Sequence, residues 1–133
     1  MNQRGFATLE VILMVMVIGI LASIAVPRFN SIATSANTAK VQSDLATIDT
    51  AIAIYQMENS EEPSMSNVKA YLQDADNIEP PIGDVYLNSS EGNQGKLTIT
   101  SSMSYDVTKQ DDGEYRATLE GHTAGEFRKA TTN

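Results

Sequence analysis

The sequence contains no cysteine, no tryptophan and only one histidine among its 133 residues. Without cysteine, the chain can form neither a disulfide framework nor a thiolate metal site. The one histidine, His122, stands beside a glycine and has no partner set for a catalytic triad or a zinc site. A glycine-rich loop of the kind that binds phosphate is also missing from the sequence. We therefore expect a protein that is not an enzyme.

Positive charge is scarce as well, because 9 Lys+Arg stand against 17 Asp+Glu and the net charge is -8. A protein that binds nucleic acid through its phosphates needs a basic surface, so we expect no direct nucleic-acid binding. The length suits one domain and excludes a two-domain enzyme. With aromatic residues at 6%, the core is expected to be aliphatic and modest.

The apolar residues are concentrated near the N-terminus. Residues 11–26, VILMVMVIGILASIAV, carry no charge, and FATL at 6–9 extends this stretch with Glu10 as its one interruption. As a helix, residues 6–26 would span about 32 Å at roughly 1.5 Å per residue, close to the thickness of a bilayer core. A core helix in so small a protein would show a polar face, and this stretch has none. We predict a helix that inserts into a membrane.

Three interpretations of this helix stay open on the residues alone. It could be a cleaved signal peptide, with residues 2–4 as its polar start and Ser-Ile-Ala at 23–25 as its cleavage site. It could be a plain signal anchor. It could also follow a short leader that is cut between Gly5 and Phe6, so that the apolar helix is kept in the mature protein.

Glu10 bears on this choice, because a carboxylate within an apolar helix is costly and requires a partner. If the mature chain began at Phe6, its free amine would lie four residues from Glu10 and would be a natural counter-ion in the same chain or a neighbour. Alternatively, Glu10 could lie among the lipid headgroups.

A second, amphipathic helix is predicted directly after Pro27, a residue that breaks or kinks helices. Apolar residues recur at helical spacing at Phe29, Ile32, Ala33, Ala36, Val41, Leu45, Ile48, Ile52 and Tyr55. Polar residues define the opposite, solvent-facing side, namely Lys40, Gln42, Asp44, Asp49 and Gln56. The helix is expected to cover residues 28–58, with Asn59 as its stop signal.

The remainder of the chain predicts a small antiparallel sheet. Residues 59–83 are expected to form a loop and a short helix that Ser64 or Ser66 caps and that ends near Gln73. Strands are predicted at 85–87, 96–100, 105–108 and 115–119, with loops at 89–95 and 110–113, giving a sheet within residues 84–120. The small, polar tail at 121–133 is expected to fray. The fold class is α+β, a long N-terminal helix covered by the sheet.

The N-terminal pattern resembles that of the type IV prepilins and pseudopilins. The resemblance rests on residues 5–10, GFATLE, followed by the apolar run with Gly19 inside it and Pro27 after it. Residues 43–63, SDLATIDTAIAIYQMENSEEP, also resemble the helix end and turn of major pseudopilins and short pilins. The resemblance covers roughly the first 63 residues and implies the pilin-like fold.

The resemblance also implies roles for five residues. Residues 1–5 would be a leader that prepilin peptidase removes after Gly5, and Phe6 would become an N-methylated N-terminus. Glu10 would pair with the Phe6 amine of a neighbouring subunit during filament assembly. Gly19 and Pro27 would let the helix loosen when it is packed, although Gly19 could equally serve a close helix–helix contact. Residues 6–27 would form the filament core and residues 28–133 the soluble head.

On this resemblance we expect a structural subunit of a type IV pilus-like filament that serves adhesion, motility or DNA uptake. Its partners would be copies of itself, prepilin peptidase, membrane lipid before assembly, and an inner-membrane platform with its ATPase. It would cross the inner membrane once, with the head outside the cytoplasm, and then enter an extracellular pilus or a periplasm-spanning pseudopilus. One alternative is a major pseudopilin of a type II secretion system. Another is a membrane-anchored or secreted binding domain.

Major pseudopilins of this kind can bind calcium in a late loop, so the acidic loops are of interest. Two groups of carboxylates occur in the head: Asp74, Asp76, Glu79 and Asp84, and separately Asp111, Asp112 and Glu114. Neither group has the spacing of a calcium-binding loop. We expect no metal and no cofactor, with calcium as the one candidate.

Overall fold

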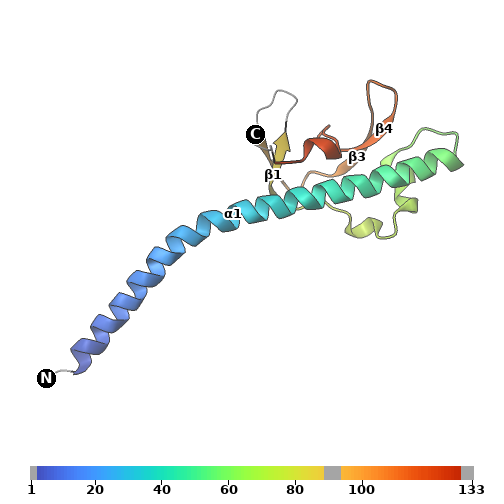
Figure 1. The fold of residues 1–133 in the computed structure, drawn as a ribbon. Helices are drawn as coiled ribbons and strands as arrows, with labels where there is room; N and C mark the ends of the chain where they lie inside the picture. The colour runs from blue at the N-terminus through green and yellow to red at the C-terminus, as the bar shows by residue number, and fades with distance from the viewer. Residues whose placement is uncertain (1–2, 89–93, 130–133) are drawn as a thin grey trace. The chain divides into compact units, whose positions relative to one another are not determined.

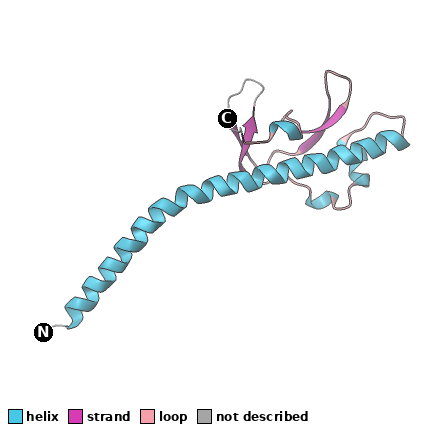
Figure 2. Cartoon of the chain, in the orientation of Figure 1, coloured by secondary structure: helices cyan, strands magenta, loops and turns pink. Residues whose placement is uncertain are grey.

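The computed structural model describes residues 3–88 and 94–129, with only the backbone of Gln94 included. The helices are α1 (Gln3–Glu58) and α2 (Met65–Val68), and the strands are β1 (Gly83–Asn88), β2 (Gln94–Ile99), β3 (Tyr105–Lys109) and β4 (Tyr115–Leu119) (Figures 1 and 2). Short 3₁₀ turns follow at η1 (Lys69–Tyr71), η2 (Ala75–Asn77) and η3 (Ala124–Glu126). The chain divides into two compact units, Met1–Ala33 and Thr34–Asn133, which we term the N-terminal unit and the head.

The N-terminal unit consists of the first half of α1. This half is helical on either side of Pro27, and its most apolar 18-residue window has a mean hydropathy of 2.7 with no buried residue. Within the described residues, α1 is the one helix long and apolar enough to cross a membrane. The predicted apolar helix is therefore present.

In the head, one face of α1 forms the floor of the core. Val41, Leu45 and Ile48 are fully buried, and Ile52 and Tyr55 nearly so. The spacing of four, three, four and three residues puts these side chains on one stripe. The helix ends at Glu58, where the Asn59 side chain donates to the Tyr55 carbonyl at 3.2 Å. The amphipathic character of this half of α1 and the stop at Asn59 agree with the prediction.

The strands form two separate two-stranded sheets, so the single sheet expected over residues 84–120 is divided. β1 pairs antiparallel with β2, and β3 pairs antiparallel with β4. Each hairpin contributes its own apolar residues to the shared core, which includes Val85 and Ile99 from the first sheet and Tyr105, Ala117 and Leu119 from the second. Because both hairpins cover the same stripe of α1, the core closes without a hydrogen-bonded ladder between them. The α+β class is confirmed.

Polar contacts fix the first hairpin on α1. The backbone N–H of Tyr86 donates to the buried Thr38 hydroxyl at 2.9 Å, and that hydroxyl donates to the Thr34 carbonyl at 2.6 Å. The Asn37 side chain donates to the Asp84 carbonyl at 3.3 Å. Gly83 adopts a φ of 128°, and a Cβ there would lie 3.0 Å from the Asn37 amide nitrogen. This approach of strand to helix therefore requires glycine at position 83.

The second hairpin is fixed by two carboxylates that were expected to face solvent. Asp44 accepts a hydrogen bond from the Tyr105 hydroxyl at 2.8 Å, and Asp49 accepts one from the backbone N–H of Ala117 at 2.7 Å. Both carboxylates are half-buried, so the solvent-facing assignment was wrong for them. Burial, and then the Asp44 carboxylate, raise the pKa of Tyr105, so its hydroxyl remains a proton donor.

The first part of the expected apolar stripe lies outside the head core. Phe29 and Ile32 are 68% and 62% exposed, and Ala33 and Ala36 are exposed as well. At this level of the helix, Thr34 and Thr38 are the buried residues instead. The Thr38 hydroxyl accepts the backbone N–H of Tyr86 on strand β1, and an apolar side chain could not provide that acceptor.

The C-terminal segment does not fray over its described part, contrary to the expectation for the tail. Leu119 and His122 exchange two backbone hydrogen bonds of 3.0 Å around a turn in which Glu120 and Gly121 both have positive φ. Thr123 and Glu126 then form a capping box on η3, and Phe127 is fully buried. Because its sequence neighbours are polar, Phe127 was not predicted to be buried, although it is one of the largest residues of the core.

Replacing Phe127 with alanine should destabilise the head strongly. The change removes a fully buried ring, and such changes cost about 3–5 kcal/mol. In a unit of this size the melting temperature should fall by more than about 10 °C. The measurement is thermal unfolding of the full chain in detergent by circular dichroism. Met57→Ala is the matched control, because Met57 is 86% exposed, and it should melt as the wild type does. Equal melting of the two variants would refute the anchoring role.

The C-terminal turn should also show a specific pH dependence. Burial alone would raise the pKa of Glu126. The hydrogen bonds from the Thr123 N–H and the His122 side chain lower it by more than burial raises it, so the pKa lies below its usual 4.5. A depressed pKa means that this carboxylate stabilises the fold above about pH 4.5 and loses that effect as the pH falls. Glu126→Gln should therefore melt below the wild type at pH 7, with a gap that narrows as the pH falls below about 4.5.

The same titration needs a control carboxylate outside the turn. Glu61 is exposed, and no ion pair links it to the described residues. Glu61→Gln should follow the wild-type melting curve at each pH. A gap for Glu126→Gln that stays constant from pH 7 to pH 3 would contradict the assignment.

Candidate functional site in the N-terminal unit

The N-terminal unit exposes apolar side chains on every side of α1. Their exposed fractions lie between 51% and 69% at Phe6, Leu9, Val11, Ile12, Leu13, Met14, Val15, Met16, Val17, Ile18, Ile20, Leu21, Ile24 and Val26. A helix that is apolar all round is stable only in apolar surroundings, such as lipid or other apolar helices. The chain itself covers none of this surface, so the surroundings must come from outside it.

The hydroxyl groups of this segment are satisfied within the helix. Thr8 donates to the Arg4 carbonyl at 2.9 Å, and Ser23 donates to the Ile20 carbonyl at 2.7 Å. In a medium without water, an unpaired hydroxyl would cost free energy, and these bonds remove that cost. Arg4 and Arg28 stand on either side of the apolar stretch, where long basic side chains can reach the headgroups.

Glu10 is the exception in this satisfied segment. Its carboxylate is exposed, and neither a hydrogen bond nor an ion pair joins it to any residue that the structure describes. In this chain the nitrogen of Phe6 is a peptide nitrogen within α1, so no charged amine exists at that position. The expected pair of Glu10 with a Phe6 amine therefore requires cleavage before Phe6.

Gly5 and Gly19 have no local reason to be glycine. A Cβ at either position would meet no other atom within 4 Å, and neither residue has a positive φ. A glycine within a helix costs about 1 kcal/mol relative to alanine. Within the described chain, no contact of either glycine offsets this cost.

Pro27 also weakens α1 locally. Proline has no N–H, so the carbonyl of Ser23 loses its usual helical partner while α1 continues through the site. Gly19 and Pro27 therefore bracket a stretch of the apolar helix with reduced intrinsic stability. The structure places both in the N-terminal unit with Phe6 and Glu10.

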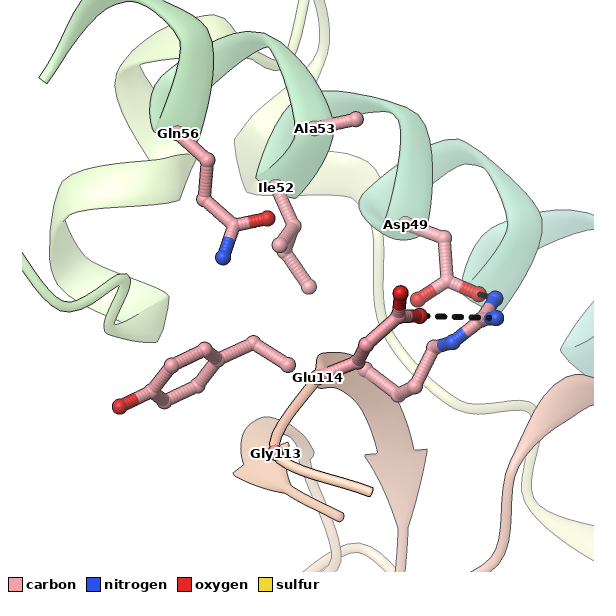
Figure 3. Close-up of a pocket in the computed structure, with 8 residues that line it drawn as sticks. Asp49, Ile52, Ala53, Gln56, Gly113 and Glu114 are labelled. Carbon is pink, nitrogen blue, oxygen red and sulfur yellow. Dashed lines mark hydrogen bonds and ion pairs between the residues drawn. The ribbon is translucent and has the colours of Figure 1, made fainter.

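The head contains hollows, but their chemistry is that of a solvated surface. One hollow of about 380 Å³ lies between α1 and the β3–β4 turn (Figure 3). Arg116 neutralises its two carboxylates, at 3.8 Å from Asp49 and 3.5 Å from Glu114. Its lining has no histidine, serine, threonine or cysteine, and both of its carboxylates pair with Arg116.

The remaining titratable candidates serve the fold. His122 bonds Glu126 at 3.2 Å and packs edge-on against Phe127. Among residues 3–88 and 94–129, no three acidic or histidine side chains are grouped to hold a metal ion. The sequence did not reveal the contacts of Asp44 and Asp49, because such contacts depend on which strand lies opposite each helix turn.

Known proteins similar to this chain are components of secretion systems and pili. The chain is 30% identical over 117 residues to type II secretion system core protein G of Klebsiella pneumoniae, which covers 75% of this chain and 84% of that protein. It is 29% identical over 128 residues to core protein G of Klebsiella michiganensis, covering 84% and 90%. It is 36% identical over 70 residues to the type IV narrow pilus major component PilA5 of Thermus thermophilus, covering 53% and 60%. No family model and no solved structure matches the chain.

These relatives agree with the residues and with the fold. The similarity to core protein G extends well beyond the N-terminal motif, over three quarters or more of the chain. The relatives are structural subunits, which confirms the expectation that the chain is not an enzyme. The chain combines this similarity with an exposed apolar helix, which carries one carboxylate, and a small α+β head. It therefore belongs to the superfamily of type IV pilins and type II secretion pseudopilins.

Proposed function

We propose that this protein is a structural subunit of a type IV pilus-like filament and that it assembles through the N-terminal unit. The observation that carries the proposal is an apolar helix surface that is exposed on all sides and interrupted by one unpaired carboxylate, Glu10. A plain membrane anchor needs the apolar surface but has no use for the carboxylate. A filament of identical apolar helices uses both.

Before assembly, the segment is held by lipid. Twelve strongly apolar residues within 6–26 each favour the bilayer centre by about 0.3–0.6 kcal/mol, a sum of about 4–7 kcal/mol. Leaving the membrane therefore requires a destination that is equally apolar. The same segments of neighbouring subunits supply it, so homopolymer formation replaces lipid by protein without exposing the helix to water.

The N-terminus is proposed to be processed before assembly. Prepilin peptidase would cut the leader 1–5 after Gly5, whose lack of a side chain leaves the scissile bond open. Phe6 would then carry a free, N-methylated and cationic amine. Because the pair forms in a medium of low dielectric constant, a Glu10 carboxylate in one subunit and a Phe6 amine in the next would attract each other far more strongly than in water. An unpaired Glu10 would oppose packing, so the pair also sets the register between subunits.

The rest of the assembly machinery lies outside this chain. We propose a single pass through the inner membrane with the head outside the cytoplasm, and residues 28–133 as the head that the mature filament displays. A platform in that membrane and its ATPase would drive extraction, since the sequence has no phosphate-binding loop of its own. Gly19 and Pro27 would let the helix loosen locally as it leaves lipid.

A major pseudopilin of a type II secretion system is the second candidate. The observation that favours it is the extent of similarity to core protein G, which spans 84% of this chain in one relative. A deletion of the gene distinguishes the two candidates. Loss of surface filaments with normal export of enzymes indicates a pilin, and loss of export with surface filaments unchanged indicates a pseudopilin.

Glu10→Gln should abolish filaments while leaving the subunit in the membrane. The amide removes the charge that would pair with the Phe6 amine and keeps the size of the side chain. Filaments counted by electron microscopy should fall by at least tenfold, and the amount of membrane-bound chain should stay unchanged.

Glu61→Gln is the control for this change. Glu61 is an exposed head carboxylate outside the ion pairs of the described residues, so its variant should assemble normally. Filaments of normal number with Glu10→Gln would show that the carboxylate has no role in assembly. The protein would then be better explained as a membrane-anchored binding domain.

Two substitutions at Gly19 separate its alternative roles. Gly19→Ala adds a methyl group that meets no atom of the chain, so membrane insertion should be unchanged. If glycine is needed for loosening, both Gly19→Ala and Gly19→Leu should reduce filament number, since each strengthens the helix. If it is needed for a close contact, Gly19→Leu should reduce the number much more than Gly19→Ala does. Normal filaments with both variants would exclude either role.

A further inference from the structure

Two lysines of the head share one tyrosine ring. Lys96 on β2 lies opposite Tyr86 on β1, and its ammonium is 5.9 Å from the ring centroid. The ammonium of Lys129 is also 5.9 Å from that centroid. Tyr86 itself is buried, while both lysines are exposed. We term these three residues the basic patch.

The basic patch places two ammonium groups on one ring, whereas the Tyr115 ring carries only that of Lys109. Lys40, Lys109 and Arg116 each form an ion pair with a carboxylate, and within the described residues Lys69 and Arg128 form none. Within residues 3–88 and 94–129, no carboxylate pairs with Lys96 or Lys129. The ring orients the two ammonium groups, because cations are attracted to its face. Two positioned cations are therefore presented to the surroundings.

This arrangement stands out because the head is strongly acidic. From Thr34 onward the sequence has 16 of the 17 acidic and seven of the nine basic residues, so the head carries a charge of about -9. Identical heads at the short spacing of a filament would repel one another if acidic surfaces faced each other. A filament of this subunit therefore favours a contact that places its positive groups against negative groups of the next copy.

The complementary surface is the acidic segment formed by Asp74, Asp76 and Glu79 around η2. All three residues are exposed, and within the described ranges none of their carboxylates has a cationic partner. Lys40 reaches this segment, but its ammonium bonds the backbone carbonyl of Glu79, at 2.9 Å. The carboxylates stay available to another molecule.

The basic patch and the acidic segment belong to different sides of the head. Figure 1 shows α2 and the following turns on one side of the second half of α1 and strand β1 on the other. Among the described residues, no ion pair joins the two surfaces within one chain. Two different complementary patches on one subunit generate a head-to-tail contact, and repetition of such a contact gives an open helical array rather than a closed dimer.

We propose that the basic patch of one subunit docks on the acidic segment of the next subunit in the filament. This inference rests on the proposed filament function and names a contact between heads, in addition to the packing of the apolar helices. The contact orients neighbouring heads and offsets their mutual repulsion. Because it involves exposed charges, salt should weaken it.

Charge reversal and charge exchange test the contact in the full chain. Lys96→Glu with Lys129→Glu should lower filament number at least tenfold, and so should Asp76→Lys with Glu79→Lys. The variant that combines all four changes should restore filaments to at least half of the wild-type number, because the charges are exchanged and the contact is kept. Asp74 is left in place because its carboxylate accepts a hydrogen bond from Asn77.

The control pair adds negative charge at exposed head residues outside both surfaces. Thr50→Glu with Met57→Glu should leave filament number near that of the wild type, because neither residue belongs to the basic patch, the acidic segment or an ion pair. Membrane level, intact mass and melting temperature are measured for every variant, so that a processing or folding defect is detected. Restoration by the exchange variant supports the contact, and loss of filaments in the control pair to the same degree overturns it.

Cysteine cross-linking tests the contact directly, because the chain has no cysteine of its own. Filaments with both Lys129→Cys and Asp76→Cys should give a ladder of covalent multimers with a short bismaleimide. Each single variant should give no ladder. Filaments that form normally without a ladder in the double variant overturn this contact and leave the filament function intact.

Two further outcomes would separate the sources of failure. Absence of filaments from the wild type would remove the proposed function and this contact with it. Normal filaments with Lys96→Glu and Lys129→Glu, together with weaker binding of the full chain to phosphatidylglycerol vesicles, would assign the basic patch to lipid and overturn docking between subunits.

Discussion

The apolar surface of the N-terminal unit is the constraint on which the rest of the structure depends. Its side chains are more than half exposed on every side, and the chain covers none of them. Such a helix must exchange one apolar environment for another without passing through water. Lipid and then neighbouring copies meet this requirement. Under the proposed pairing, Glu10 is costly alone but gains a cationic partner from each neighbouring copy, which would also set the register between subunits.

The head covers its own apolar surface within one chain and needs no lipid or second copy for this. From Val41 onward only one face of α1 is apolar, and two small hairpins cover it. Polar side chains on the flanks of that face also bind the strands. Thr38 and Asp49 accept the backbone N–H groups of Tyr86 and Ala117, and Asp44 accepts the Tyr105 hydroxyl. Phe127 adds the last large side chain from the C-terminal turn. The outer surface is left with an uneven distribution of charge, which a homopolymer must match between copies.

Sequence patterns predicted most elements of this fold, and the exceptions share a cause. Periodicity located the core stripe of α1 and the strands, because it reports which residues tend to be buried. It does not report the partner, so the division into two sheets, the contacts of Asp44 and Asp49 and the exposure of Phe29 and Ile32 were not foreseen. Phe127 was missed because its neighbours are polar. Of the site, the exposed apolar surface followed from composition, whereas the roles of Gly5, Phe6 and Glu10 depend on cleavage and on partners outside this chain.

The N-terminal residue of the mature protein tests the central claim most directly. The protein should be recovered from its own cells, and its intact mass and N-terminal sequence should be determined. The account predicts a chain that begins at an N-methylated Phe6 and keeps the whole apolar segment, ready for packing in a filament. A chain that begins at Val26 would show that the segment is a signal peptide, and an intact Met1 would show a simple anchor. Either result would contradict assembly through this helix.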